Sequence, residues 1–282
     1  MTIMRGLPAS GKSTKAAEII REGNTVRINK DLLRTMLHLD KFTGRNDGHT
    51  RDAARKLADW FLANSVNVVI DDTNLNPATV QSWKDLAKIH GAKIEYADCL
   101  DVSVEECIAR DAAREKRVGA HVIQRMALQH LSYLAGERAI ICDLDGTLCD
   151  IRHRLGFVQG ETKNWHALFG AISNDILRMD VVEQIAKWST ADTRLILVSA
   201  RPDTYREATE QWLEQNFHLR YAALIMRDSN DKRPDTEVKA DFYDKYLKRL
   251  DIAVIFDDRP SVIRMWRERG LNVIDVGQGV EF

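Results

Sequence analysis

Apolar residues in the first half of the chain fall into short runs separated by longer amphipathic stretches. The short runs, which predict buried strands, lie at residues 2–4, 25–28, 66–70 and 93–100. The amphipathic stretches, which predict helices, lie at residues 15–21, 31–37, 50–64, 76–91, 103–117 and 121–134. Residues 46–51 are polar, include Gly48 and predict a loop. Strands and helices that alternate in this order predict a doubly wound parallel sheet.

The second half of the chain has a comparable pattern. Apolar runs at residues 139–142, 195–198, 222–226 and 252–256 predict further strands, and a predicted helix begins at Asp235. A chain of 282 residues is long enough for two domains of similar size. We place the joint at Gly136 and expect an α/β protein with two doubly wound parallel-sheet domains, residues 1–136 and 137–282.

Composition and charge narrow the class of protein. Apolar residues make up 44% of the chain, and no apolar run approaches the ~20 residues needed to cross a bilayer. The chain enters its first motif almost at once, which leaves no room for a cleaved signal. The four cysteines form no C-x-x-C pair, so we expect a cytoplasmic protein without membrane contact. A net charge of −1 argues against coating a duplex, and a nucleic-acid substrate would be gripped near an end.

The first motif directly follows the first predicted strand. Residues 6–14 read GLPASGKST and fit G-x-x-x-x-G-K-[ST]. Backbone N–H groups of such a loop surround a polyphosphate, the lysine reaches the β- and γ-phosphates, and the serine can ligate Mg²⁺. A glycine-rich turn that binds nothing would not explain the flanking strand and helix. The residues predicted to bind a nucleoside triphosphate are Gly6, Leu7, Pro8, Ala9, Ser10, Gly11, Lys12, Ser13 and Thr14, with Ser13 as a metal ligand.

Acidic residues at two strand ends are candidates for an acceptor site. Asp31 lies where a kinase needs a base, and Arg34 on the same helical face could hold an acceptor phosphate. Asp31 could instead be a helix N-cap, a common role for aspartate. Asp71 and Asp72 end the third strand, in the crevice where open α/β sheets bind ligands.

A basic helix is predicted near the end of the first half. Its charged residues are Arg110, Arg114, Lys116 and Arg117. In P-loop phosphotransferases such a helix closes over the donor phosphates and offsets transition-state charge. The simpler alternative is a solvated helix face.

The motifs GLPASGKST, NKDLLR and IDDTNLNP, followed by the arginine helix, resemble the 5′-kinase domain of bacteriophage polynucleotide kinase–phosphatases. The resemblance covers essentially the whole first half. Ala9 departs from the glycine common in these loops and adds a methyl group where the backbone curls around phosphate. The implied roles are ATP and Mg²⁺ binding for Lys12 and Ser13, general base for Asp31, acceptor-phosphate binding for Arg34, support of that site for Asp72, and contact with the donor phosphates for Arg114.

The second half carries a different motif after its first strand, residues 143–147, DLDGT. Asp143 can attack phosphorus to form an aspartyl-phosphate, and Asp145 can protonate the leaving oxygen and later activate water. A carboxylate that approaches a phosphate dianion needs a metal and other cations beside it. A calcium-type loop is the alternative, but Leu148 and Cys149 follow where regularly spaced oxygens would be required.

Three later positions supply further polar groups. Ser199 and Arg201 follow the strand at 195–198, and the pair Asp257-Asp258 follows the strand at 252–256. Asp235 begins a helix with Lys239 four residues on, a spacing that also suits an ordinary surface salt bridge. Because parallel strands end at the same edge of a sheet, we expect these groups to meet.

The segments DLDGT, SAR and FDDRPSVIRMWR, with the spacing from Asp235 to Lys239, resemble haloacid dehalogenase-type phosphatases, most closely the 3′-phosphatase domain of the same phage enzymes. The resemblance implies that Asp143 is the nucleophile and Asp145 the general acid–base. Ser199, Arg201 and Lys239 would bind the phosphoryl group, with Asp235 in the catalytic set. Metal ligands are expected among Asp143, Asp145, Asp257 and Asp258, with Asp258 favoured as the direct ligand, and Arg154 is favoured over Arg152 as the arginine that follows the nucleophile loop.

The segment between Leu148 and Asp180 is a short insertion and is expected to form a small cap. A small cap leaves the mouth of the site open, which suits the end of a polymer better than a free metabolite. Trp165 lies in the cap and is a candidate for contact with a base. The tryptophans in predicted helices, by contrast, are expected in the core or an interface.

These features predict a two-domain end-healing enzyme. It would transfer the γ-phosphate of ATP to the 5′-hydroxyl of DNA or RNA and remove a 3′-phosphate, or open a 2′,3′-cyclic phosphate. We expect nucleic-acid ends as substrates. A ligase needs these products, so we also expect a functional link to a ligase. The sequence leaves open whether the protein forms a homo-oligomer. One alternative is a small-molecule kinase fused to a metabolite phosphatase. The other is a binding module with vestigial sites, which would require a missing catalytic group.

Overall fold

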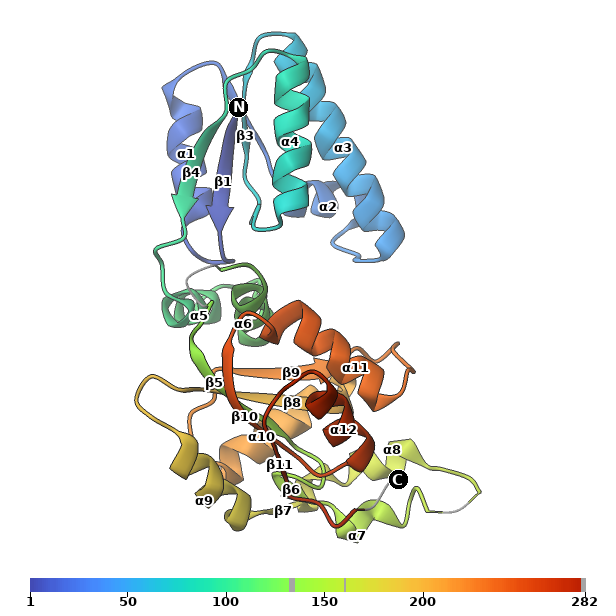
Figure 1. The fold of residues 1–282 in the computed structure, drawn as a ribbon. Helices are drawn as coiled ribbons and strands as arrows, with labels where there is room; N and C mark the ends of the chain where they lie inside the picture. Colours follow the sequence, from blue (N-terminus) through green and yellow to red (C-terminus); the bar gives the residue numbers. More distant parts are fainter. Residues whose placement is uncertain (132–134, 160, 280–282) are drawn as a thin grey trace. The chain divides into compact units, whose positions relative to one another are not determined.

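The computed structural model describes residues 1–131, 135–159 and 161–279. The chain divides into two compact units, Met1–Leu131 and Ser132–Phe282 (Figure 1). Each unit has its own parallel sheet and its own core. Within the described ranges, no helix is both long enough and apolar enough to cross a membrane.

The first unit is a parallel sheet covered by helices on both faces. Its strands are β1 (Thr2–Gly6), β2 (Thr25–Ile28), β3 (Asn67–Ile70) and β4 (Glu95–Cys99). Its helices are α1 (Lys12–Ile19), η1 (Ile20–Glu22), α2 (Lys30–His38), α3 (Gly44–Ala63), α4 (Pro77–Ile89), α5 (Val104–Ala112) and α6 (Ala120–His130). The strand order is β2-β3-β1-β4 and every pair is parallel, which confirms the predicted fold class.

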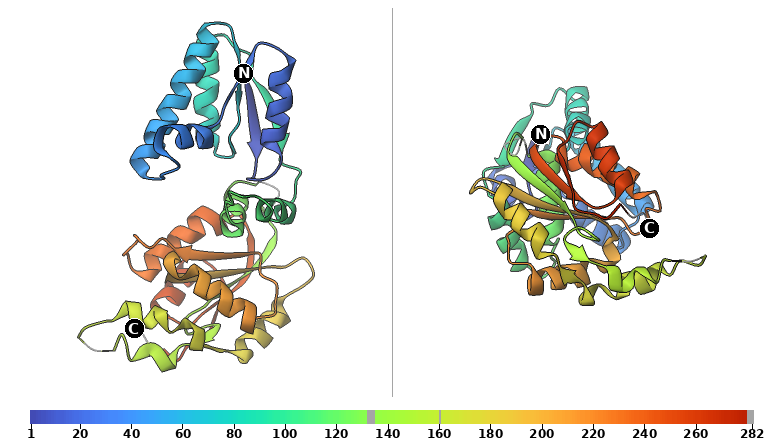
Figure 2. Two further views of the ribbon diagram at one scale, coloured as in Figure 1. Left: turned by 180° about the vertical axis from the view of Figure 1, so that it is seen from behind. Right: turned by 60° about the horizontal axis from the view of Figure 1, so that its bottom comes forward.

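Successive residues of the central strands face opposite sides of this sheet. Ile3 and Ile70 belong to a buried cluster with residues of α3 and α4 on one side. Met4 and Val69 pack with Ala16 of α1 on the other side. Figures 1 and 2 show α1 on the opposite face of the sheet from α3 and α4. Because side chains alternate along a strand, a strand buried on both faces must be apolar throughout, which explains the continuous apolar runs.

Residues 46–51 are helical, so the predicted loop is wrong. Helix α3 already begins at Gly44, where the side chain of Thr43 accepts a hydrogen bond from the Asn46 N–H at 3.1 Å. Asp47 lies in the first turn of the helix. A cap and an acidic first turn each stabilise a helix start by roughly 1 kcal/mol, which offsets the similar cost of Gly48 inside the helix.

The basic run after Arg110 is not helical, which corrects a second prediction. Helix α5 ends at Ala112, and the Asp111 carboxylate accepts hydrogen bonds from the N–H groups of Val118 at 3.0 Å and Gly119 at 2.9 Å. These bonds hold the intervening residues in an irregular turn. Helix α6 follows, and the predicted end of that helix at residue 134 lies outside the described residues.

The second unit has a larger parallel sheet and a small antiparallel pair. Its strands are β5 (Arg138–Asp143), β6 (Cys149–Asp150), β7 (Ile176–Leu177), β8 (Arg194–Pro202), β9 (Ala223–Arg227), β10 (Asp251–Asp257) and β11 (Val273–Asp275). Its helices are α7 (Arg152–Leu155), α8 (Trp165–Gly170), η3 (Ile172–Asn174), α9 (Met179–Trp188), η4 (Asp203–Tyr205), α10 (Arg206–Asn216), α11 (Asp235–Phe242), η5 (Tyr243–Leu247) and α12 (Pro260–Glu268). The parallel strands lie in the order β11-β10-β5-β8-β9, again as the fold class predicts.

Helices α9 and α10 pack on one face of this sheet, where Ile185 and Trp212 join the buried residues of β5 and β8. Helix α11 contacts β8 and α12 instead. The insertion after the nucleophile loop folds into β6, α7, α8, η3 and β7, a small cap. Trp212 and Trp266 are buried as expected, but Trp60 of the first unit is 60% exposed and is not a core residue.

Candidate active sites

The first unit has a cavity of about 510 Å³ built around the phosphate loop. The loop connects β1 to α1, and Pro8, Ala9 and Gly11 line the cavity together with the first residues of the helix. Ala9 has a φ of 62°. This left-handed conformation costs an L-residue roughly 1 kcal/mol, and it is the physical reason why glycine suits this position.

Lys12 is the buried cation of the phosphate loop. Its side chain is nearly enclosed, and Nζ donates to the Leu7 carbonyl at 2.5 Å and to Ser10 Oγ at 3.5 Å. Burial lowers the pKa of Lys12, and the Coulomb attraction of Asp71 opposes this shift. The ammonium therefore lies within the loop that would hold a polyphosphate, as predicted from the motif.

Asp31 and Arg34 lie in the same cavity as the phosphate loop. The N-cap of α2 is Asn29, whose side chain accepts from the Leu32 N–H at 2.9 Å, so the alternative reading of Asp31 as the N-cap is wrong. The Asp31 side chain is 84% exposed and accepts from Arg34 Nη1 at 2.7 Å. The second anchor of Arg34 is Asp47, whose Oδ1 accepts from Nη2 at 3.0 Å. The loop prediction for residues 46–51 concealed this role of Asp47.

The two aspartates after β3 also line this cavity. Asp72 accepts from the Lys30 N–H at 3.2 Å, and burial raises its pKa although the Lys30 charge opposes the shift. Asp71 is held by Arg27 and Asn29, yet its buried Oδ1 has no hydrogen-bond partner in the part of the chain that the structure describes. The sequence placed Asp71 with Asp72 in the predicted crevice but the resemblance gave it no role, and its place in the cavity supports it as a candidate.

Arg110 and Arg114 both reach the cavity despite the shorter α5. Arg110 pairs with Glu106 one helical turn earlier, at 2.7 Å. Arg114 lies beyond the helix end, 3.7 Å from Asp111. The structure therefore brings together the acceptor-side pair, the two arginines and six of the nine predicted loop residues, Pro8, Ala9, Gly11, Lys12, Ser13 and Thr14. Gly6, Leu7 and Ser10 do not line the cavity.

The second unit has a cavity of about 690 Å³ at the carboxyl ends of β5, β8 and β10. Asp143, Asp145, Arg201, Lys239 and Asp258 line it. The order of the strands explains this convergence, because β5 lies between β10 and β8 and their carboxyl ends meet at one edge.

Three carboxylates form an acidic cluster at the base of this cavity. Asp143, Asp257 and Asp258 each place an oxygen within 4.8 Å of the others. Lys239 Nζ bridges two of them, at 2.7 Å from Asp143 and 2.8 Å from Asp257. Burial is the largest cause that raises the pKa of Asp143; the Lys239 charge lowers it, and the two neighbouring aspartates raise it further. A divalent cation would relieve this repulsion, so the cluster fits Mg²⁺.

Within the cluster, Asp257 and Asp258 have different surroundings. Asp257 accepts from Lys239 at 2.8 Å and from Trp266 Nε1 at 3.2 Å. Asp258 accepts from Thr147 Oγ1 at 3.0 Å through Oδ1, and its Oδ2 lies against Gly146. Asp257 accepts hydrogen bonds from more protein donors than Asp258 does, which favours Asp258 as the direct metal ligand.

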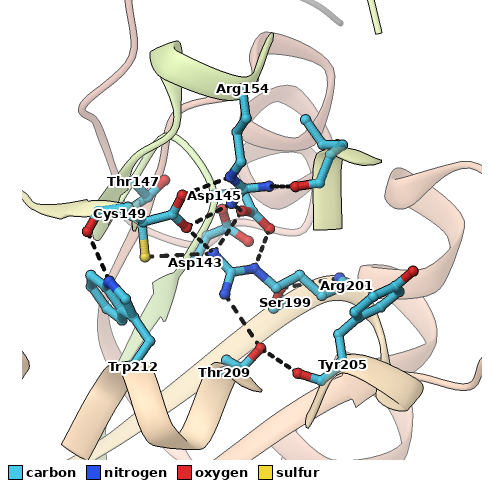
Figure 3. A network of polar contacts seen from close by, with 12 residues as sticks. Asp143, Asp145, Thr147, Cys149, Arg154, Ser199, Arg201, Tyr205, Thr209 and Trp212 are labelled. Atoms are coloured by element: carbon cyan, nitrogen blue, oxygen red, sulfur yellow. Dashed lines mark hydrogen bonds and ion pairs between the residues drawn. The ribbon is translucent and has the colours of Figure 1, made fainter. Parts of the chain in front are cut away.

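Asp145 is not one of the three carboxylates that lie within 4.8 Å of one another, and its side chain has other partners. Arg154 Nη2 donates to it at 2.5 Å, and Arg201 donates through Nε and Nη2 at 2.8 Å each (Figure 3). Burial alone would raise the pKa of Asp145, but the charges of Arg201 and Arg154 outweigh burial and hold it below its ordinary value. The carboxylate is therefore ionised and clamped by two guanidinium groups.

Asp175 completes this network and was not predicted from the sequence. It is fully buried at its side chain and accepts from Arg154 Nε at 2.6 Å and Arg201 Nη2 at 2.9 Å. Two carboxylates, Asp145 and Asp175, thus balance two buried guanidinium groups. No local pattern marks Asp175, which lies 30 positions after Asp145, so only the fold reveals the pairing.

The remaining predicted residues have definite partners. Ser199 is buried and its Oγ accepts from the Arg201 N–H at 3.1 Å. Asp235 pairs with Arg227 and Arg259 rather than with Lys239, so a surface salt bridge between residues 235 and 239 is not formed. Arg152 pairs with Asp150 on the surface, whereas Arg154 enters the buried network.

Gly146 provides a test of the acidic cluster. Its φ is +83°, and a Cβ at this position would lie 2.0 Å from Asp258 Oδ2. We expect Gly146→Ala to displace Asp258 and lower phosphatase kcat about 10²-fold, the scale of a misplaced catalytic group. Kinase activity of the same sample should be unchanged. The control is Gly156→Ala, where a Cβ meets nothing within 4 Å; full phosphatase activity in Gly146→Ala would contradict the role of Asp258.

Asp175 provides a test of the buried charge balance. Asp175→Asn leaves two buried arginines facing one carboxylate, and we expect the unfolding free energy of the second unit to fall by about 3 kcal/mol. The control is Asp150→Asn, which breaks an ion pair whose Arg152 side chain is 76% exposed and should cost less than about 1 kcal/mol. Thermal or denaturant unfolding measures both. Equal, small losses would show that Asp175 is not needed to balance the arginines.

Comparison with known proteins agrees with the two sites. Residues 1–135 match the family model of an AAA domain, and residues 137–281 match the family model of the polynucleotide kinase PNKP phosphatase domain. These matches imply ATP as the nucleotide of the first unit and are consistent with Mg²⁺ at the acidic cluster.

Two related proteins align with nearly the whole chain. A protein of Autographa californica nuclear polyhedrosis virus, provisionally named a bifunctional polynucleotide kinase/RNA ligase, is 26% identical over 296 residues, covering 95% of this chain and 41% of its own length. The present chain therefore spans about two fifths of that relative. A chain in the structure of the Pnkp1/Rnl/Hen1 RNA repair complex is 28% identical, with 99% of this chain and 96% of that chain covered and a TM-score of 0.43. Since the phosphatase model matches more than half of the sequence, the chain belongs to the family of the polynucleotide kinase PNKP phosphatase domain.

Proposed function

We propose that the chain heals both ends of a nucleic-acid strand, with residues 1–136 as a 5′-hydroxyl kinase and residues 137–282 as a 3′-phosphatase. One observation carries the proposal: Asp31 and Arg34 share a cavity with the phosphate loop. A base alone would serve any hydroxyl acceptor. A guanidinium beside that base suits an acceptor that already carries a phosphate, as a strand does and a nucleoside does not.

In the kinase reaction, the Asp31 carboxylate takes the proton of the 5′-hydroxyl. The resulting oxygen attacks the γ-phosphorus of ATP, and the bond from this phosphorus to the bridging oxygen of ADP breaks. Lys12 and Arg114 offset the charge that spreads over the transferred group, and Arg34 holds the phosphate that follows the acceptor nucleoside. When bound at Ser13, Mg²⁺ would neutralise the β- and γ-phosphates.

In the phosphatase reaction, a carboxylate oxygen of Asp143 attacks the 3′-phosphate, and the bond from phosphorus to the 3′-oxygen breaks. Lys239, 2.7 Å from Asp143, offsets the repulsion between the two anions, as Mg²⁺ held by Asp143 and Asp258 would. Asp145 takes up a proton from solvent when substrate binds and gives it to the leaving 3′-oxygen. It then takes a proton from the water that hydrolyses the aspartyl-phosphate, which releases phosphate and restores Asp143.

The clamp on Asp145 bears on this proton transfer. Arg154 and Arg201 hold the pKa of Asp145 below its ordinary value, against the effect of burial. A phosphate that engages Arg201 withdraws part of that positive charge, so the pKa of Asp145 rises when substrate binds and the group can act as an acid. After the leaving group departs, Asp145 is again suited to act as a base.

The small-molecule alternative is less well supported. A kinase for free nucleosides would not need Arg34, which is held between two carboxylates. In the second unit the cap is built from short elements only, as expected for a site that accepts the end of a polymer. The vestigial-module alternative requires a missing catalytic group, and each predicted group is present. The related viral protein is named as a kinase and ligase, so we propose that the healed ends pass to a ligase.

Two variants should separate the activities. Asp31→Ala removes the proposed base of the kinase, so we expect loss of 5′-phosphorylation while the phosphatase stays intact. Asp143→Asn removes the proposed nucleophile, so we expect loss of 3′-dephosphorylation while the kinase stays intact. Both are measured on oligonucleotides that carry a 5′-hydroxyl and a 3′-phosphate. If each variant abolished both activities in a folded protein, the two-site assignment would fail.

Asp47 should matter to the acceptor and not to ATP. Asp47→Asn weakens one of the two anchors of Arg34, and we expect kcat/KM for the oligonucleotide to fall about tenfold, the value of one charge-assisted hydrogen bond. KM for ATP should not change. Asp52→Asn, an exposed position on the same helix, is the matched control. An equal change in the KM for ATP would show that Asp47 supports the unit as a whole.

A further inference from the structure

The phosphatase cavity has two chemically different walls above the floor where the catalytic residues lie. Trp165 and Phe169 of α8 form one wall. The other wall, which we call the basic rim, consists of Arg227, Asp231, Lys232, Arg233, Asp235 and Arg259. Neither wall is needed to hold the reacting phosphate, because Arg201 and Lys239 already lie at the base of the cavity.

Trp165 presents its ring at the mouth of the cavity. It is 43% exposed and stacks on Phe169, with ring centroids 6.2 Å apart and planes 22° from parallel. Phe169 packs against the core of the unit and lies 5.2 Å from the Tyr205 ring. The inner ring is therefore anchored, and the outer ring is held in place by it. Exposing a large apolar ring has a cost that a stacked base would remove.

The basic rim carries more positive than negative charge. It has four cations and two carboxylates, a net charge of +2. Arg227 and Arg259 pair with Asp235, and Arg233 pairs with Asp231 and also with Asp241, which does not line the cavity. Among the described residues Lys232 has no carboxylate partner; its Nζ donates to the Ser229 carbonyl at 2.8 Å. A negatively charged group other than the reacting phosphate would complete this rim.

We propose that the cavity binds the last two nucleotides of a single strand, with the 3′-terminal base on Trp165 and the adjacent phosphodiester at Lys232. This inference rests on the proposed phosphatase function and names the part of the strand that the site recognises. A single-stranded terminal base is free to turn onto the ring, whereas the terminal base of a duplex is held in place by its pairing partner and by its stacked neighbour. Lys163, whose Nζ lies 5.5 Å from the Trp165 ring centroid, adds a cation beside the same base.

Trp165 is tested with substrates that differ only in the terminal base. We expect Trp165→Ala to lower kcat/KM about tenfold on a 3′-phosphorylated oligonucleotide, as for loss of one stacked base. It should not change the rate on p-nitrophenyl phosphate or on an oligonucleotide whose 3′-terminal nucleotide is abasic. Trp165→Tyr should recover most of the lost activity. Trp60→Ala, the same change at an exposed tryptophan of the first unit, is the matched control.

The outcomes distinguish a failure of this inference from a failure of the proposed phosphatase function on which it rests. An equal loss on all three substrates would mean that Trp165 only holds the cap together, and would overturn the inference. A wild-type protein that hydrolyses p-nitrophenyl phosphate but no 3′-phosphorylated oligonucleotide would overturn the proposed function itself. A selective loss on the base-bearing strand would support both.

Lys232 is tested with substrates that differ in the second phosphate. We expect wild type to prefer a 3′-phosphorylated dinucleotide to a nucleoside 3′-monophosphate, and Lys232→Ala to remove most of that preference. In Lys232→Ala, the slope of log kcat/KM for oligonucleotides against log salt concentration should decrease in magnitude by about one. Lys187→Ala, at an exposed lysine of α9, is the control. An unchanged preference in Lys232→Ala would exclude a phosphodiester contact at the rim.

Discussion

A carboxylate and a phosphate repel each other, and both sites of this protein depend on how that repulsion is balanced. In the second unit, Lys239 lies between Asp143 and Asp257, and two arginines clamp Asp145. The side chains involved are nearly all buried, where charges interact more strongly than in water. Cations and anions must therefore be placed together, and removal of either leaves an unbalanced buried charge.

Parallel sheets provide this placement. In each unit, the strands that carry the reactive groups lie side by side, so groups distant in sequence meet at one edge. Asp145 and Arg201 are 56 positions apart but share two hydrogen bonds. The same geometry in the first unit brings Asp72 close to the phosphate loop and to Asp31. We therefore propose that two units with similar architecture support opposite reactions, addition and removal of a phosphate.

The sequence predicted the parts of the structure that depend on local chemistry. The strand runs, the phosphate loop and the DLDGT motif are short patterns whose geometry follows from adjacent residues. The loop predicted at residues 46–51 is helical, because the N-cap of α3 offsets the cost of Gly48. The helix predicted beyond Ala112 is absent, because the Asp111 side chain accepts hydrogen bonds from the backbone after the helix end. The wrong prediction at residues 46–51 also concealed the pairing of Asp47 with Arg34. Asp175 was missed for a different reason, because its arginine partners are brought to it only by the fold.

The most direct test of the account follows both ends of one strand. An oligonucleotide with a 5′-hydroxyl and a 3′-phosphate is incubated with the protein, labelled ATP and an equal concentration of free nucleosides and nucleoside 3′-monophosphates. The account predicts that the label appears at the 5′ end of the oligonucleotide and that the same strand loses its 3′-phosphate. Label on the nucleosides, with the 3′-phosphate of the strand intact, would contradict it.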